Sequence, residues 1–189
     1  IGGNWHTDHS YDQIPALGSM LYAKELPKVG GDTLFAGCAA AFDTLSEGMK
    51  STLRSLRAVH SSRHVFGKSA VIPDDMADLF GNADKALQDA EHPVVIKHPL
   101  SGRETLYVNP GFTTRFVGWT EKESNSLLAF LYEHISRPEH TYRFQWSKGA
   151  LAFWDNRATW HLAVNDYPGE TRLMHRIRIE GESLEPEKN

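Results

Sequence analysis

The sequence of 189 residues has one cysteine, no long apolar run and no excess of basic residues. Because Cys38 has no partner for a disulfide within the chain, we expect a reducing, cytoplasmic compartment. No stretch approaches the roughly 20 apolar residues of a membrane-spanning helix. The formal net charge of −4 lacks the basic balance of a nucleic-acid-binding domain. We therefore expect neither a membrane nor a nucleic acid as a partner.

An initiator methionine and a signal-peptide pattern are also missing. The hydrophobic content of 40% is enough for a core, and the length suits a single domain over residues 1–189. The first chemically distinctive residue is His6, and chain termini fray unless other residues hold them. We therefore expect this domain to lack an N-terminal part. The sequence leaves open whether the chain forms a homo-oligomer.

Short apolar or alternating segments recur along the chain and predict strands. These segments are 19–23, 33–36, 94–98, 105–108, 141–146, 150–154 and 172–179. The turn residues of 99–103 separate two of them and predict a hairpin. Cys38 precedes a predicted helix, and we expect it to be a small buried or helix-starting residue rather than a nucleophile.

Three helices are predicted, at 39–45, at 46–56 and from Thr120 toward His134. Thr120 is a suitable N-cap, because acidic residues follow it in the first turn. The polar and acidic region around residues 60–92 predicts a lid or excursion with partial helix. Many short strands with a few flanking helices favour a mostly β fold, either a sandwich or a jelly roll.

A possible metal site starts at His6-Thr7-Asp8. In a strand, His6 and Asp8 would project to the same side and could bind one ion. The candidate for a second imidazole is His161, which lies between apolar neighbours. Two imidazoles and one carboxylate suit iron, zinc, copper or manganese and leave one face of the metal open. On spacing alone, the alternative is a chance arrangement among the 10 histidines.

Arg172 and Arg176 are four residues apart near the end of the chain. If this segment is a strand, both guanidinium groups lie on one face, where they could bind a carboxylate or a sulfonate. The alternative is an ordinary solvated face with surface ion pairs. Leu173, Ile177 and Ile179 alternate with the two arginines and predict a second face that packs on the core.

Five short segments occur in a fixed order along the chain. They are 4–8 (NWHTD), 23–34 (AKELP with GGDTL), 108–114 (VNPGFTT), 154–161 (WDNR with a final His) and 166–176 (DY with RLMHR). In this order they closely resemble the taurine dioxygenase family, which also includes the 2,4-dichlorophenoxyacetate dioxygenases. These enzymes are 2-oxoglutarate-dependent, non-haem iron(II) oxygenases. The resemblance covers nearly the whole chain. Each motif alone is weak, whereas five motifs in register are specific.

The resemblance implies a fold, a metal site and a co-substrate site. The implied fold is the double-stranded β-helix, a cupin-like jelly roll. His6, Asp8 and His161 would bind Fe(II), and Thr33 with Arg172 would hold the distal carboxylate of 2-oxoglutarate. Together with O₂, this co-substrate would be converted to succinate and CO₂ while the substrate is hydroxylated.

The substrate implied by the resemblance is a small organic anion, and a taurine-like sulfonate is favoured. Arg176 matches the position that binds the sulfonate in the taurine enzyme, and Trp154 is similar to a tryptophan near the iron. Tyr11 and Phe66 could line the same pocket. His9 and Tyr11, however, stand where taurine-acting members tend to have Val and Phe, which puts taurine itself in doubt.

Four alternatives remain open. The chain could belong to an aryloxyalkanoate or other carboxylate dioxygenase of the same family. It could be a metal-binding jelly roll without catalysis, such as a sensor or storage module. It could also be an inactive fragment. A zinc hydrolase could use the same ligand types, but the sequence has no HExxH helix.

Overall fold

The computed structural model describes residues 2–66 and 88–184. The strands are β1 (Gly18–Glu25), β2 (Thr33–Gly37), β3 (Arg57–Ser61), β4 (Asp89–Pro93), β5 (Val95–Lys97), β6 (Glu104–Leu106), β7 (Thr113–Phe116), β8 (Thr141–Phe144), β9 (Leu151–Asp155), β10 (Thr159–Ala163) and β11 (Leu173–Ile179). The helices are α1 (Cys38–Asp43), α2 (Glu47–Arg54), α3 (Arg63–Phe66), α4 (Glu121–Ile135) and the 3₁₀ helix η2 (Pro138–His140). None of the described helices is both long and apolar enough to cross a membrane.

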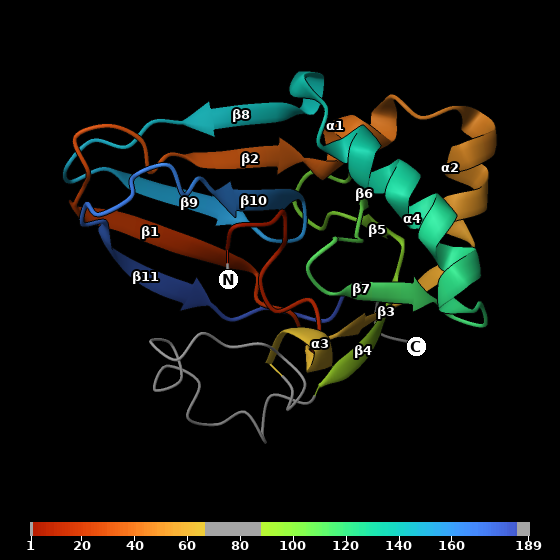
Figure 1. Cartoon of the computed structure of the whole chain (residues 1–189). Coiled ribbons are helices and arrows are strands. Elements are labelled where there is room, and N and C mark those ends of the chain that lie inside the picture. Colours follow the sequence, from red (N-terminus) through yellow and green to blue (C-terminus); the bar gives the residue numbers. More distant parts are fainter. Residues whose placement is uncertain (1, 67–87, 185–189) are drawn as a thin grey trace.

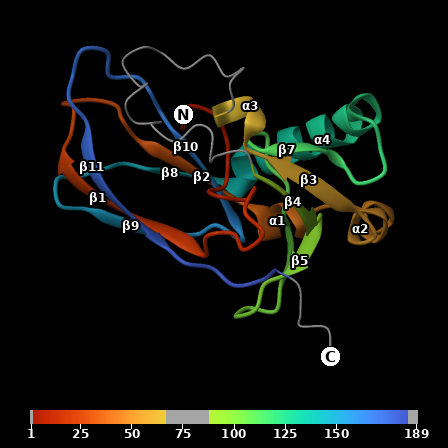
Figure 2. The same cartoon turned by 90° about the horizontal axis from the view of Figure 1, so that it is seen from below.

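Two three-stranded antiparallel sheets face each other (Figures 1 and 2). One has the order β11-β1-β9 and the other β10-β2-β8. Their inner faces meet through aromatic rings, since the ring of Trp154 in β9 lies 5.4 Å from that of Phe35 in β2. A third sheet, β4-β3-β7, and the hairpin β5-β6 lie beside the helices. The predicted mostly β jelly roll is confirmed.

The main hydrophobic core lies between the helices and the neighbouring strands. Its large buried members include Trp160 of β10, Phe42 of α1, Phe116 of β7 and Leu131 of α4, each at most 2% exposed. The indole Nε1 of Trp160 donates a hydrogen bond to the carbonyl of Val108 at 2.8 Å. Because successive side chains of a strand point to opposite faces, a Trp160 anchored in this core directs His161 into the space between the two sheets.

All seven predicted strand segments overlap strands, and the three predicted helices are present as α1, α2 and α4. Thr120 forms a capping box with Glu123, as its position before acidic residues indicated. Cys38 is the first residue of α1 and is buried, which raises the pKa of its thiol to about 12. Strands β3, β4, β7 and β10 were not predicted. The predicted excursion around 60–92 contains paired strand at both ends, and residues 67–87 lie outside the described residues.

The prediction that the apolar residues of β11 face the core is wrong for two of them. Leu173 is 42% exposed and Ile177 is 62% exposed. Ile177 lies opposite Met20 of β1, which in turn pairs with Phe153 of β9, and Phe153 is 56% exposed. Within the described part of the chain, no element covers this outer face of the sheet. Alternation shows which residues share a face, but it does not show what lies against that face.

Candidate metal and anion site

A backbone bridge brings the two ends of the chain together at the candidate metal site. His6 and His161 form an isolated antiparallel bridge, in which each amide donates to the other residue's carbonyl at 3.1 and 2.9 Å. Residues in such a bridge lie side by side. The two imidazole rings accordingly lie with their centroids 4.1 Å apart.

Asp8 completes a cluster with these two histidines, which we call the triad (His6, Asp8 and His161). One ligand atom from each residue lies within 4.8 Å of the others, and each side chain is buried. The carboxylate lies between the imidazoles, with Oδ1 3.8 Å from the Nε2 of His6 and Oδ2 3.8 Å from the Nε2 of His161. The expected strand over His6 and Asp8 is wrong, because Asp8 begins a turn directly after the bridge. The convergence therefore comes from the bridge and the turn.

The triad is in the protonation state that binds metal ions. Burial lowers the pKa of His6, and burial together with the neighbouring His6 lowers the pKa of His161 to about 3. Burial alone would raise the pKa of Asp8, but His161 and Arg176 outweigh it and hold that pKa below its usual value. Two neutral imidazoles and one charged carboxylate are the donor set of many transition-metal sites, so these residues fit a divalent metal such as iron.

Polar contacts around the triad orient its ligands. The Nδ1 of His6 lies 2.8 Å from the carbonyl of Asn4, so Nδ1 carries the proton and Nε2 is left for the metal. The hydroxyl of Thr7 donates to the carbonyl of Asn156 at 2.6 Å and fastens the loop of the triad to the turn between β9 and β10. The Nδ1 of His161 is buried and has no hydrogen-bond partner among the described residues.

The segment 108–114 packs against His6. A Cβ atom at Gly111 would lie 2.8 Å from the Cβ of His6, so only glycine allows this close approach. The side chain of Asn109 accepts a hydrogen bond from the amide of Phe112 at 2.9 Å and donates one to Ser10 at 3.0 Å. This packing explains why the motif at 108–114 accompanies the triad.

The carboxylate of Asp8 has two further partners. The hydroxyl of Ser19, in β1, donates to its Oδ2 at 2.8 Å. The guanidinium of Arg176, in β11, contacts the same oxygen at 2.5 Å. The sequence predicted Arg176 as an anion-binding residue, but it indicated neither the contact with Asp8 nor the role of Ser19.

Arg172 and Thr33 lie together at the other end of the cavity. A terminal nitrogen of Arg172 lies 3.4 Å from the Oγ1 of Thr33, and its Nε donates to the carbonyl of Gly31 at 2.9 Å. The indole Nε1 of Trp146 also donates to the Thr33 Oγ1, at 3.0 Å. That oxygen accepts from both neighbours, so its own proton is available to an additional acceptor. Trp146 was not predicted as a site residue, and nothing in the sequence pattern around it indicated this role.

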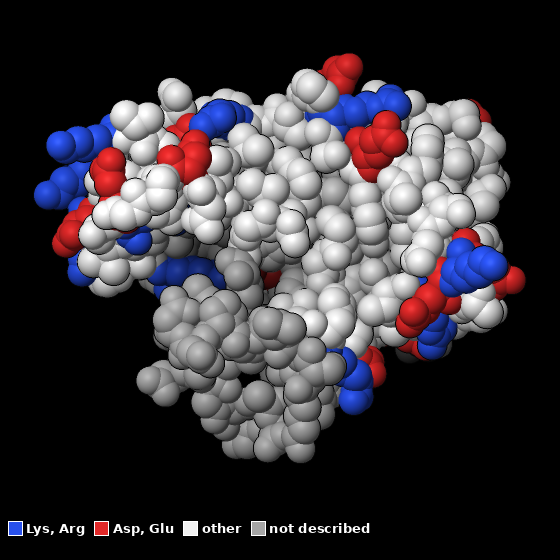
Figure 3. Space-filling view, in the orientation of Figure 1, with Lys and Arg blue, Asp and Glu red and all other residues white. Residues whose placement is uncertain are grey.

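A cavity of about 230 Å³ joins the triad to these residues. Its lining includes Trp154, Arg176 and Tyr11, which the sequence predicted, and also Phe112. The ring of Tyr11 packs edge-on against Phe112 with centroids 4.8 Å apart, and burial raises the pKa of its hydroxyl to about 12. The structure does not describe the side chain of Phe66. In the space-filling view, basic side chains border a hollow in this part of the molecule (Figure 3).

His9 is a further lining residue of this cavity. Its φ of 57° is the one positive value at a non-glycine position in the described chain. Its Nδ1 lies 3.0 Å from the carboxylate of Asp12, and Arg178 approaches the ring at 3.2 Å. A conformation that costs free energy persists where the surroundings enforce it. The departure from the taurine pattern therefore lies on the wall of the cavity.

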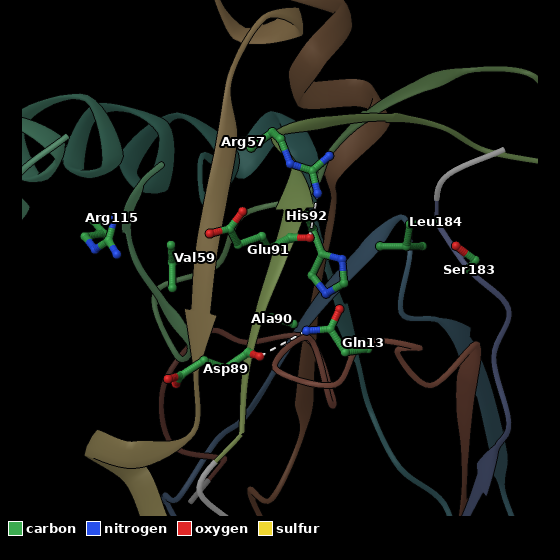
Figure 4. A pocket seen from close by; sticks show the side chains of 10 residues that line it. All are labelled: Gln13, Arg57, Val59, Asp89, Ala90, Glu91, His92, Arg115, Ser183 and Leu184. Carbon is green, nitrogen blue, oxygen red and sulfur yellow. Dashed lines mark hydrogen bonds between the residues drawn. The ribbon is translucent and has the colours of Figure 1, made fainter. Parts of the chain in front are cut away.

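A larger cavity, of about 680 Å³, lies elsewhere, over strands β3 and β4 (Figure 4). Several of its polar groups already have partners. Arg57 donates to the carbonyl of Glu91, and Gln13 donates to the carbonyl of Asp89. Among the described residues, the triad is the one group of metal-ligating side chains close enough to hold an ion. Volume alone therefore does not identify the site.

Comparison with known families agrees with this geometry. The family model described as "Taurine catabolism dioxygenase TauD, TfdA family" matches residues 1–178. An alkylsulfatase of Acinetobacter baylyi is 38% identical over 182 residues, which cover 95% of this chain and 57% of the relative. An alpha-ketoglutarate-dependent sulfate ester dioxygenase of Pseudomonas putida is 37% identical over 183 residues, which cover 95% of this chain and 60% of the relative.

Solved structures agree as well. The crystal structure of AAD-2, in complex with Mn(II) and N-oxalylglycine, superposes with a TM-score of 0.83 at 28% identity. The match covers 98% of this chain and 71% of that one. The chain thus spans somewhat more than half the length of the two curated relatives.

Proposed function

The chain belongs to the TauD/TfdA dioxygenase family, and from this premise we propose that it carries the metal and co-substrate site of a 2-oxoglutarate-dependent iron(II) dioxygenase acting on a small organic anion. The observation that carries the proposal is the convergence of the triad within 4.8 Å, in a cavity that Arg172 and Thr33 also line. A metal-binding jelly roll without catalysis would not need a half-buried cationic group in the same cavity as the metal ligands.

His6, Asp8 and His161 would hold the iron, with the neutral imidazoles and charged carboxylate described above. When bound, iron(II) supplies the redox chemistry that couples oxidative decarboxylation of 2-oxoglutarate, to succinate and CO₂, with hydroxylation of the substrate. The role of the protein is to fix the positions of the metal, the co-substrate and the substrate. The triad donates from one side only, so the opposite side remains open to the co-substrate and O₂.

Arg172 and Thr33 would bind the distal carboxylate of 2-oxoglutarate. Burial lowers the pKa of Arg172, and its hydrogen bonds in the structure go to the neutral oxygens of Gly31 and Thr33. A half-buried guanidinium without a bound carboxylate gains most from an anionic ligand. The hydroxyl of Thr33 can donate a second hydrogen bond to the same carboxylate, because its oxygen accepts from Trp146 and Arg172 and its proton is available.

Arg176 would bind the anionic group of the substrate, with Tyr11 and Trp154 along the walls. The two relatives compared above are named for sulfate esters, and an alkylsulfonate presents a similar –SO₃ group to a guanidinium. We therefore propose an alkylsulfonate or alkyl sulfate ester as the substrate, with a taurine-like sulfonate as the first compound to test. Hydroxylation of the carbon next to such a group gives a product that collapses to an aldehyde and sulfite or sulfate. An aryloxyalkanoate is the alternative, because a carboxylate can bind the same arginine.

The test uses the intact gene product under anaerobic conditions. Addition of iron(II) and 2-oxoglutarate together should give a weak visible charge-transfer absorption that neither gives alone. Admission of O₂ should then release succinate, fastest with the correct member of a panel of alkylsulfonates, alkyl sulfate esters and aryloxyacetates.

Two results would contradict the proposal. One is a folded protein that binds iron but shows neither the absorption nor any succinate release. The other is release of sulfate from an ester without 2-oxoglutarate and O₂, which would indicate a metal-dependent hydrolase.

A further inference from the structure

We infer that Ser19 is a positioning residue for Asp8, and that it reserves one carboxylate oxygen, Oδ1, for the metal. The inference rests on the proposed function, since it concerns how the triad presents its carboxylate. Ser19 is fully buried, and its hydroxyl donates to the Oδ2 of Asp8 at 2.8 Å. Burial of a hydroxyl costs free energy unless it forms a hydrogen bond, and the hydroxyl of Ser19 forms this bond with Asp8.

The two oxygens of Asp8 have different surroundings. Oδ2 accepts from the Ser19 hydroxyl and also contacts the Arg176 guanidinium, so both of its lone pairs have donors. Oδ1 lies 3.8 Å from the Nε2 of His6, which is too far for a hydrogen bond. Among the described residues, no donor therefore occupies the lone pairs of Oδ1, and they are available to a metal ion between the imidazoles.

This asymmetry affects what else can bind. A carboxylate that is free to turn can offer both oxygens to one metal, and the second oxygen would then take a position that a co-substrate requires. With Oδ2 held by Ser19, Asp8 contributes one oxygen. Arg176 cannot fix the carboxylate alone, because its side chain is 46% exposed and is the group proposed to bind the substrate.

The backbone of β1 holds the serine in place. Ser19 lies opposite Trp154 of β9. The preceding residue, Gly18, is so close to β9 that a Cβ atom there would lie 2.5 Å from the carbonyl oxygen of Trp154. Because the two strands approach so closely here, β9 fixes the position of β1, and with it the position of the Ser19 hydroxyl relative to Asp8.

The test compares two matched deletions of a buried hydroxyl, Ser19→Ala and Ser124→Ala. Ser124 is also fully buried, but its hydroxyl donates to the carbonyl of Thr120, at the start of α4. Binding of Mn(II) alone is titrated by the loss of the aqueous Mn(II) electron paramagnetic resonance signal, and thermal unfolding is followed in parallel. We expect Ser19→Ala to weaken Mn(II) binding about 10- to 100-fold, the usual range for loss of a hydrogen bond to a metal ligand. Ser124→Ala should lower stability and leave Mn(II) binding unchanged.

Equal Mn(II) affinity of Ser19→Ala and the wild-type protein would overturn the inference, as would equal weakening in both variants. If Ser19→Ala does not fold, Ser19→Cys, with its weaker donor, takes its place. We then expect Mn(II) binding several-fold weaker than wild type, and unchanged affinity would again overturn the inference. A wild-type protein that binds no Mn(II) would instead contradict the proposed function, so the two failures are distinguishable.

Discussion

Two buried groups of histidines in this molecule look alike at first but differ in what they can do. The triad is one. The other lies on the sheet β4-β3-β7, where His60 and His92 have ring centroids 5.3 Å apart and Tyr107 packs against both. Both groups are shielded from water, and burial lowers the pKa of His60 well below its usual value, as it does for the triad histidines.

The two groups differ because the triad contains a carboxylate and borders a cavity. The second group consists of two imidazole rings and a phenol ring and includes no carboxylate, and the His92 ring forms a hydrogen bond with the carbonyl of Asp12. The triad includes Asp8 and opens into a cavity lined by Arg172 and Arg176. Buried imidazoles alone are therefore structural residues. A charged ligand between two imidazoles, beside a cationic cavity, makes a candidate catalytic site.

The largest effect should come from His161→Ala. Removal of one of the three donors should weaken Mn(II) binding by more than about 100-fold and abolish 2-oxoglutarate-dependent turnover. His92→Gln is the matched control, because it changes a buried histidine of the second group. It should leave Mn(II) affinity unchanged. Comparable loss in both variants, measured by the same titration, would show that the two groups do not differ as we describe.

The next effect concerns the anion-binding end of the cavity. Arg172→Ala should weaken 2-oxoglutarate binding about 10- to 150-fold, because a charge-assisted hydrogen bond contributes about 1.5–3 kcal/mol. Mn(II) affinity should stay within a few-fold of wild type. Arg54→Ala, which removes an exposed arginine paired with Glu104, is the control and should change neither. Anaerobic titration with 2-oxoglutarate measures the effect, and an Arg172→Ala protein with wild-type affinity would remove this residue from its proposed role.

The smallest effect is a pH dependence of stability that involves the second group. His60 stays neutral in the folded protein, whereas in the unfolded chain it takes up a proton below pH about 6.5. The unfolded state then binds more protons, so metal-free protein should lose stability as the pH falls below about 6.5, by up to about 1.4 kcal/mol per pH unit for each such histidine. His161, with a pKa of about 3, acts in the same direction.

His60→Gln tests this, because glutamine keeps a polar side chain that does not titrate. Urea unfolding between pH 7.5 and 5.5 should give a shallower decline for the variant than for the wild type. Parallel curves would show that His60 does not contribute to the pH dependence.

Local sequence signals predicted part of the fold and of the site. The N-cap at Thr120 and the turn between 94–98 and 105–108 are contained within a few residues, and both were found as predicted. The triad was predicted because five motifs occur in register, and the structure brings its three side chains together. Strand β10 was missed because it follows directly on a tight turn after Asp155, where apolar periodicity has no room to develop. Ser19 carries no signal of its own, since a serine in an apolar strand usually has no special role.

The sequence by itself determined the chemistry available to this protein, namely which residues can donate to a metal or bind an anion, and it indicated most of the strands and helices. Only the tertiary structure decided that His6 bridges to His161 and that the two carboxylate oxygens of Asp8 have different partners. It also decided that the outer face of β11 is exposed rather than buried. The physical reason is that residue type and spacing act over a few residues, whereas contacts between distant segments depend on how whole sheets pack against each other.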